Sequence, residues 1–153
     1  KMFSIGDDFW IEDEHGQRAF KVDGKALRIA DTLDFEDPHG RKLVKMKGKV
    51  ITVRGQIRLE REGGKGGVVK KDLINIVRDH LVLSVDGGQD YDIKGNFLDH
   101  EYEFYKGRDK VAEVSKKWFR IRDSYGVQIE QGEDDILLLA ATVAVDQLCH
   151  DVH

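Results

Sequence analysis

The 153-residue sequence has one proline and one cysteine, and it lacks a basic then apolar leader ending in small residues. So little proline excludes a collagen-like or proline-rich chain, and a lone Cys149 excludes an internal disulfide. Without a leader or a disulfide framework, neither secretion nor organelle import is indicated. We therefore expect a cytoplasmic protein.

Excess positive charge is also lacking. Twenty-five Lys and Arg residues face 29 Asp and Glu residues, which gives a formal net charge of -4 at pH 7. No global positive field draws such a chain to nucleic acid, so we expect no nucleic-acid partner. Any site for an anion must be a local patch.

Apolar and charged residues are both plentiful. The chain is 40% hydrophobic and 35% charged, enough apolar material to bury a core and too much for an intrinsically disordered chain. At this length we expect one domain over residues 1–153. Its organisation is expected to be strands over about 3–131 and a helix over about 134–150.

Short runs with apolar residues at about every second position, typical of half-buried antiparallel strands, follow one another through most of the chain. Clear examples are Trp10–Asp13, Phe20–Val22, Leu33–Phe35, Leu43–Lys47 and Ile57–Leu59. Segments 13–16, 37–40 and 123–126 each begin with Asp and end with Gly, which suits tight turns. The glycine-rich segment 63–67 predicts a flexible hairpin tip.

An internal repeat supports this all-β interpretation. Residues 12–25 and 36–49 are identical at seven of fourteen positions when they are aligned at an offset of 24. A repeated hairpin cannot bury its apolar face alone, so successive hairpins must curl around a common core.

The apolar run Ile136–Val145 predicts what fills that core. Glu133, Asp134 and Asp135 precede it, and carboxylates favour the first turn of a helix. The run leaves no polar stripe, so the helix must be buried on all sides. Ten helical residues span only about 15 Å, too short for a transmembrane segment, which we do not expect. The predicted fold is mainly β, a closed or nearly closed antiparallel barrel with this helix on its axis.

Six further segments, taken in order, resemble the LURP-one-related family in its prokaryotic branch. That family belongs to the tubby C-terminal-like superfamily, which also contains phospholipid scramblases. The segments are Phe3–Asp8, Val22–Lys25, Gly95–Phe104, Ser115–Phe119, Asp123–Val127 and Gly132–Leu137. The resemblance covers essentially the whole chain and implies a roughly twelve-stranded closed barrel around a hydrophobic C-terminal helix.

The same resemblance implies binding rather than catalysis, without naming the ligand. Tubby domains bind phosphoinositides through basic residues on the barrel wall, but no such residue can be matched here motif by motif. Scramblase activity is not expected, because the one apolar helix is needed inside the barrel.

The densest positive segment is 115–122. A strand period of two places Lys116, Trp118, Arg120 and Arg122 on one face and Phe119 and Ile121 on the other. Such a basic face with one aromatic residue could bind phosphate groups. The alternative is a solvated wall on which Trp118 packs beneath a loop or beside a β-bulge near Lys117. We take these four residues as the candidate ligand-binding site.

Other basic and glycine-rich features favour structural roles. Lys45, Lys47 and Lys49 alternate with apolar residues, and exposed strand lysines deter edge-to-edge aggregation. Segment 63–67, followed by Lys70 and Lys71, lacks the spacing of a Walker A phosphate loop. No nucleotide or other cofactor is predicted.

The histidines, acids and cysteine do not form a recognisable catalytic or metal motif. His15 and His39 fit solvated turns better than zinc ligands, and adjacent Cys149 and His150 point apart on a helix. We predict no metal and no catalytic residue.

Two acidic features have structural explanations. The segment 99–101 and the pair Asp134 and Asp135 could form a clustered-carboxylate site, but helix capping and a bond from a strand-end side chain explain the pair better. Asp146 is expected where the helix leaves the far end of the barrel, because full burial without a partner would be costly.

Three hypotheses remain open. The first is a non-enzymatic binding module for an anionic lipid headgroup or another phosphorylated ligand. The second is a structural or regulatory barrel that binds a protein partner, with an oligomeric state that the sequence does not determine. The least favoured is a small hydrolase or metal-dependent enzyme around His100 and Asp99.

Overall fold

A computed structural model describes residues 1–6, 10–23, 32–48, 55–71, 80–118 and 124–150. Its elements are β1 (Met2–Ile5), β2 (Trp10–Glu12), β3 (Arg18–Asp23), β4 (Thr32–Glu36), β5 (Lys42–Gly48), β6 (Gln56–Arg61), β7 (Gly67–Lys71), β8 (His80–Val85), β9 (Tyr91–Asn96), β10 (Glu101–Lys106), β11 (Asp109–Ser115), β12 (Tyr125–Ile129) and α2 (Asp135–His150). The predicted fold class is confirmed.

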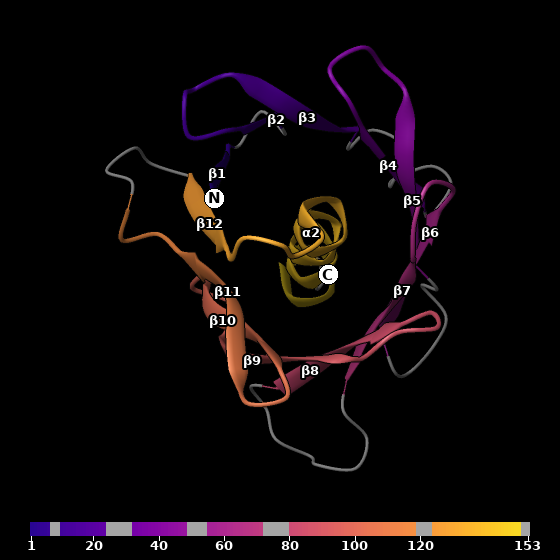
Figure 1. Ribbon diagram of the computed structural model, residues 1–153, viewed down its shortest axis with the longest axis vertical. Coiled ribbons are helices and arrows are strands. Elements are labelled where there is room, and N and C mark those ends of the chain that lie inside the picture. Colours follow the sequence, from indigo (N-terminus) through magenta and orange to yellow (C-terminus); the bar gives the residue numbers. More distant parts are fainter. Residues whose placement is uncertain (7–9, 24–31, 49–54, 72–79, 119–123, 151–153) are drawn as a thin grey trace.

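The strands form a closed antiparallel barrel in which neighbours in sequence are neighbours in space (Figure 1). The ring closes through β1, which pairs with β2 on one side and with β12 on the other. Closure satisfies the backbone groups that an open sheet would leave exposed at its edges.

The sequence repeat corresponds to two hairpins with the same turn chemistry. In each turn one aspartate oxygen, Oδ1 of Asp13 or of Asp37, accepts two backbone N–H bonds of 2.9–3.0 Å. Gly16 and Gly40 follow with φ of 75° and 83°, a left-handed conformation that glycine adopts without strain. Both predicted turns are therefore confirmed.

Two other turn predictions need correction. The turn expected at 123–126 is wrong for Tyr125 and Gly126, which begin β12 and pair with Ile5 and Ser4. The glycine-rich tip is shorter than expected, because Gly67 opens β7 and Gly66 is buried. A Cβ atom on Gly66 would collide with the backbone oxygen of Leu59, so close packing requires glycine there.

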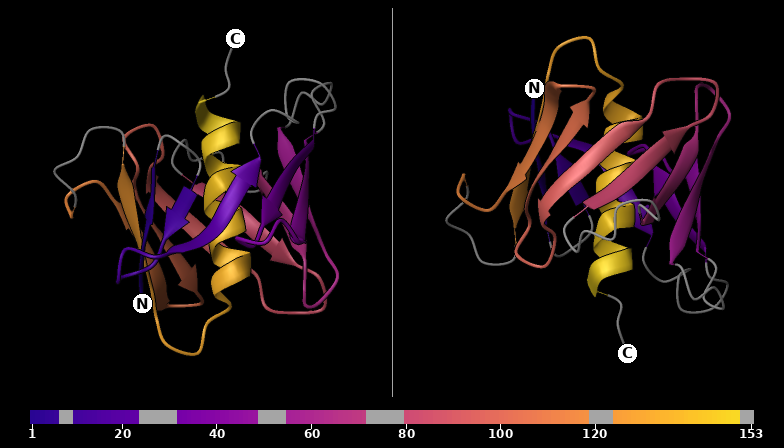
Figure 2. Two further views of the ribbon diagram at one scale, coloured as in Figure 1. Left: turned by 90° about the horizontal axis from the view of Figure 1, so that it is seen from above. Right: turned by 90° about the horizontal axis from the view of Figure 1, so that it is seen from below.

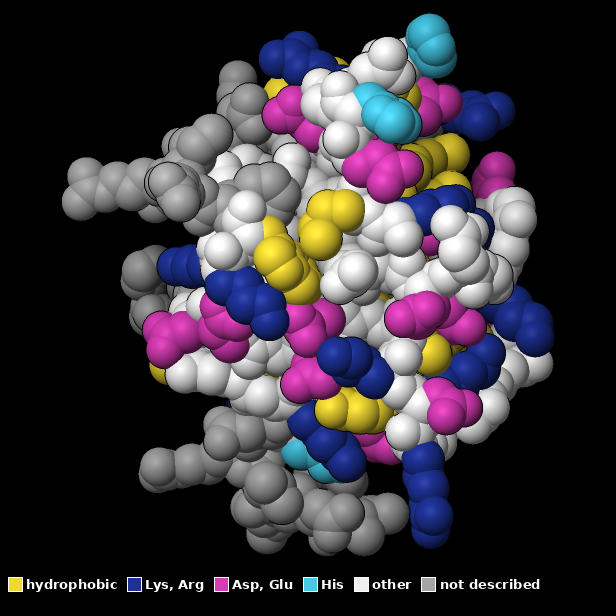
Figure 3. Space-filling model, turned by 60° about the vertical axis from the view of Figure 1, so that its left-hand side comes forward, with side chains coloured by type: hydrophobic (Ala, Val, Ile, Leu, Met, Phe, Trp, Pro, Cys, Tyr) yellow, Lys and Arg dark blue, Asp and Glu magenta, His cyan; other side chains and the backbone are white. Residues whose placement is uncertain are grey.

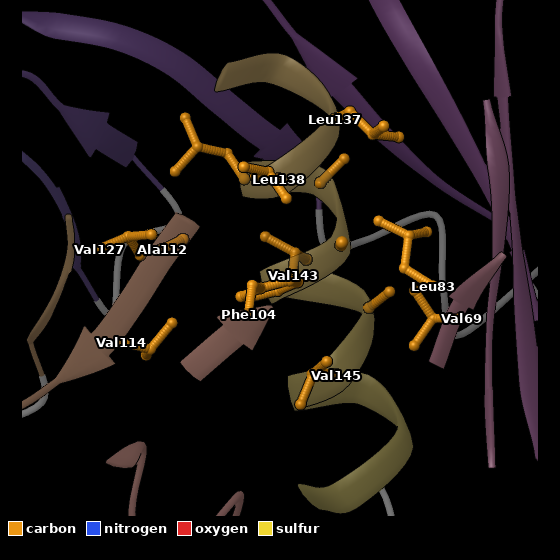
Figure 4. Close-up of a cluster of buried hydrophobic side chains, with 14 of the residues drawn as sticks. Val69, Leu83, Phe104, Ala112, Val114, Val127, Leu137, Leu138, Val143 and Val145 are labelled. Carbon is orange, nitrogen blue, oxygen red and sulfur yellow. The ribbon is translucent and has the colours of Figure 1, made fainter. Parts of the chain in front are cut away.

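Helix α2 runs along the barrel axis and is buried on every side (Figure 2). Leu137, Leu138 and Leu139, successive positions about 100° apart around a helix, are 3%, 0% and 0% exposed. Apolar side chains of the strands point inward at α2 from opposite walls, as Val69 and Val127 do in Figure 4. The barrel and the helix therefore share one core.

The barrel has two openings, and we name them by the helix. At the first opening, where α2 begins, Oδ1 of Asp134 accepts a hydrogen bond from the Leu137 amide (3.2 Å). Oδ2 of the same residue accepts a hydrogen bond from Arg61, at the end of β6 (2.5 Å). Nζ of Lys1 lies 2.7 Å from Oδ2 of Asp135 and forms an ion pair with it. The prediction that these acids cap the helix and meet a strand-end side chain is confirmed. The second opening surrounds the end of α2.

Candidate functional site

A polar cluster lies at the second opening, at the edge of the largely apolar core. The ring of His100 stacks on that of Tyr125, with centroids 4.2 Å apart and planes inclined by 14°. Nδ1 of His100 lies 3.2 Å from Oδ1 of Asp146 on α2, and the Tyr125 hydroxyl donates to Oδ2 of the same carboxylate. The cluster joins the β9–β10 turn, β12 and the helix.

Asp146 is the centre of this cluster, and its environment explains its partners. Its side chain is 19% exposed and lies near the C-terminal end of α2, where the helix dipole disfavours a negative charge. A carboxylate at such a place needs nearby donors. The expectation that Asp146 sits where the helix leaves the barrel, with partners, is confirmed.

Burial controls the ionisation of the groups around Asp146. Burial, with the negative charge of Asp146 as a second cause, raises the pKa of Tyr102 and of Tyr125 well above the usual value. Burial and then Asp146 also raise the pKa of the Cys149 thiol to about 11. Both phenols and the thiol are therefore protonated at neutral pH, and Cys149 is a poor nucleophile.

The β9–β10 turn that carries His100 is tightly held. Phe97 is 6% exposed, with its ring 5.2 Å from that of Tyr102. Asn96 and Asp99 exchange two hydrogen bonds, from the Asn96 side-chain amide to Asp99 Oδ2 (2.8 Å) and from the Asp99 backbone to Asn96 Oδ1 (3.1 Å). His100 has a φ of 54°. Between these anchors, Leu98 is 64% exposed.

The predicted basic segment begins beside this turn, but its first residues do not continue a strand. Strand β11 ends at Ser115, and residues 116–118 form a bend and turn. One oxygen of Glu101 accepts the Ser115 hydroxyl (2.7 Å), and the other accepts the Lys116 amide (3.0 Å). The common strand face expected for Lys116 and Trp118 is therefore wrong, because side-chain acceptors replace the ladder bonds there.

The candidate ligand-binding residues differ in how far the structure places them. Lys116 is exposed and makes no ion pair with any described residue. Lys117 pairs with Glu113 (3.1 Å), and its Nζ lies 5.2 Å from the centre of the half-buried Trp118 ring. Arg120 and Arg122 lie outside the described residues. The sequence alone therefore remains the basis for grouping the four.

Several cations on the barrel wall lie beside acids on neighbouring strands. Lys47 pairs with Glu60 (3.1 Å), and Lys45 lies opposite Asp34 on one side and Glu60 on the other. Figure 3 shows basic and acidic side chains intermixed on one face of the molecule. The wall is therefore not a continuous positive surface, in keeping with the structural role expected for Lys45 and Lys47. Lys49 lies outside the described residues.

The hypothesis that residues 99–101 form a carboxylate cluster with Asp134 and Asp135 is wrong, because the two segments lie at opposite openings of the barrel. Asp99 lies beside the second opening, whereas Asp134 and Asp135 cap the helix at the first. Within the part of the chain that the structure describes, no three His, Cys, Asp or Glu side chains are placed to hold a metal ion. His15 and His39 are exposed turn residues.

The sequence singled out His100 and Asp146 separately but did not reveal their contact. It offered Glu101 only as part of a possible carboxylate cluster and gave Tyr125 no role. The signal for Tyr125 was weak, because the segment around it suggested a turn. The role of Glu101 as an acceptor for Ser115 and Lys116 becomes visible only when β10 and β11 are paired.

Three comparisons place the chain among known proteins. The sequence model of the LURP-one-related family matches residues 1–146. The chain is 29% identical over 151 residues to the protein YxjI of Bacillus subtilis, covering 99% of this chain and 91% of that protein. A protein from Arabidopsis thaliana solved by X-ray analysis is similar in structure, with a TM-score of 0.58 and 19% identity, over 94% of this chain and 86% of that one. This structural likeness concerns the fold.

Length and hydropathy give one further result. Among the described residues, no helix combines the length and the apolar character needed to cross a bilayer.

Proposed function

This chain belongs to the LURP-one-related family, and from that premise we propose that it is a non-enzymatic module that binds anionic phospholipid headgroups. The proposed binding residues are Lys116, Trp118, Arg120 and Arg122. The observation that carries the proposal is Lys116, an exposed cation without an ion-pair partner among the described residues. It lies two positions before Trp118, whose ring is 5.2 Å from the Nζ of the neighbouring Lys117. On the wall, by contrast, Lys42 and Lys47 form ion pairs with acids on neighbouring strands, Asp34 and Glu60.

The chemistry around His100 does not favour the hydrolase hypothesis. Asp146 is occupied by Tyr125 and His100, and the Cys149 thiol is held protonated by a pKa of about 11. A hydrolase would need an activated nucleophile and a base that is free to take its proton. These residues instead support a structural role that fixes the end of the helix to the wall.

Charge reversal within the segment provides the test. We expect the protein to co-sediment with vesicles of phosphatidylcholine and phosphatidylserine, to bind phosphatidylcholine vesicles poorly, and to lose binding as salt rises. The variant Lys116→Glu/Arg120→Glu should remain folded and lose most of the binding. As a matched control, Lys45→Glu/Lys70→Glu makes the same charge change on the barrel wall and should retain binding to a greater extent.

Two results would overturn the proposal. One is wild-type protein that binds no vesicle at either salt concentration, which would favour the protein-partner hypothesis. The other is equal loss of binding in the two double variants, which would indicate attraction by overall charge and no local site.

A further inference from the structure

We propose that the β9–β10 turn is an apolar insertion element, with Leu98 entering the bilayer interface beside the basic segment. The inference rests on the proposed function and deepens it, because it identifies the target as the surface of an anionic membrane. A soluble compound with the same phosphate group would not be sufficient for tight binding. Its starting point is exposure. Among the described residues, Leu98 is the one exposed large hydrophobic side chain, at 64%.

The residues around Leu98 hold it outward. Phe97, immediately before it, is buried against Tyr102, and Asp99, immediately after it, is bonded to Asn96. The amide of His100 closes the turn by donating to the carbonyl of Phe97 (3.3 Å). Within the turn, a buried aromatic residue is followed directly by an exposed leucine. Little conformational entropy is then lost when the tip meets a surface, because its neighbours are already ordered.

His100 ties the same turn to the body of the protein. Its ring stacks on Tyr125 of β12, and its Nδ1 contacts the carboxylate of Asp146 on α2. The turn is thus braced by a strand and by the axial helix. A left-handed φ of 54° at a residue other than glycine persists only where surrounding contacts fix it. The polar cluster at the second opening therefore has a positioning role for Leu98.

The turn is also connected directly to the basic segment. Glu101 follows Leu98 by three residues, a span of at most about 11 Å, and its carboxylate binds the Ser115 hydroxyl and the Lys116 amide. Leu98 and Lys116 consequently belong to one rim of the barrel. An apolar tip on the same rim as Lys116, which has no ion-pair partner among the described residues, is complementary to a bilayer, which offers hydrocarbon below a layer of anionic headgroups. The Asp99 carboxylate next to the tip accepts a hydrogen bond from the Asn96 amide.

Lys116 and Leu98 require different properties of a ligand. Lys116 can attract phosphate from any source, but the leucine side chain gains free energy only when it leaves water for an apolar medium. A deacylated headgroup offers no such medium. Intact anionic vesicles should therefore bind far more tightly than glycerophosphoserine, the soluble form of the same headgroup.

The experiment compares Leu98→Ser with Val82→Ser, which removes an outward-facing apolar side chain from the middle of β8. Binding is measured by titration with phosphatidylcholine and phosphatidylserine vesicles, and glycerophosphoserine is used as a competitor. We expect Leu98→Ser to weaken vesicle binding about tenfold, or ~1.4 kcal/mol, with an unchanged melting temperature. Val82→Ser should bind like the wild type. A gain-of-function variant, Leu98→Trp, should bind vesicles more tightly.

The outcomes separate this inference from the proposed function. Wild-type binding that Leu98→Ser leaves intact, or that Val82→Ser weakens equally, overturns insertion while leaving lipid binding in place. Displacement from vesicles by glycerophosphoserine at concentrations comparable to those of the lipid also overturns it, since the free headgroup would then suffice. Absence of wild-type binding removes the premise and both proposals with it.

Discussion

Replacing Leu137, Leu138 or Leu139 by alanine should each lower the free energy of unfolding by about 2–5 kcal/mol. All three side chains are at most 3% exposed, although they point in different directions from the helix axis. A helix lying on the outside of a sheet would expose at least one of three consecutive positions and tolerate its truncation. Urea unfolding of the three variants measures the effect.

Leu98→Ala is the matched control, because it makes the same chemical change at a side chain that is 64% exposed. Its cost should stay within about 0.5 kcal/mol. The account of an axial helix fails if any of the three helix variants is as stable as this control. For the same reason the buried Ala141, which is 0% exposed, should not accept a larger residue, and Ala141→Phe should cost about 1–3 kcal/mol through overpacking.

Removal of the Tyr125 hydroxyl is the second change with a large expected effect. Tyr125→Phe should cost about 1–3 kcal/mol, because it takes a hydrogen-bond donor from the carboxylate of Asp146 in a largely buried place. In an Asp146→Leu background the same substitution should cost little, since the hydroxyl has then already lost its acceptor. The double-mutant cycle, measured by urea unfolding, reports this coupling directly.

A surface pair of the same chemistry provides the comparison. The Tyr105 hydroxyl donates to Oε2 of Glu103 on the outer wall (2.9 Å), where water can replace the bond. Tyr105→Phe should therefore change stability by less than about 0.5 kcal/mol. Equal costs for Tyr125→Phe with and without Asp146 would show that the two side chains are not energetically coupled.

The fold was predictable because its main signals are periodic and local. Alternating strands show a period of two, the repeat predicts two equivalent hairpins, and an apolar run without a polar stripe requires burial on all sides. The Asp-Gly turns at 13–16 and 37–40 depend only on residues within the turn. The turn expected at 123–126 failed because pairing of Tyr125 with Ile5, more than a hundred residues away, outweighs the local preference.

The site was less predictable because it depends on contacts between distant segments. His100 and Asp146 are 46 positions apart, and only the closed barrel brings the β9–β10 turn to the end of the helix. The basic segment illustrates the converse. Its alternating pattern predicted a strand. In the structure, however, the Glu101 carboxylate accepts hydrogen bonds from the Ser115 hydroxyl and the Lys116 amide, and strand pairing ends there. No pattern within 115–122 carries that information.

Trp118 allows the central claim, that the rim at the second opening meets anionic lipid, to be tested in one measurement. The chain has two tryptophans, so Trp10→Phe leaves Trp118 as the sole tryptophan. We predict that its fluorescence shifts to shorter wavelengths when vesicles of phosphatidylcholine and phosphatidylserine are added, that high salt reverses the shift, and that phosphatidylcholine alone produces none. Emission that stays unchanged while the protein co-sediments with the vesicles would contradict the account.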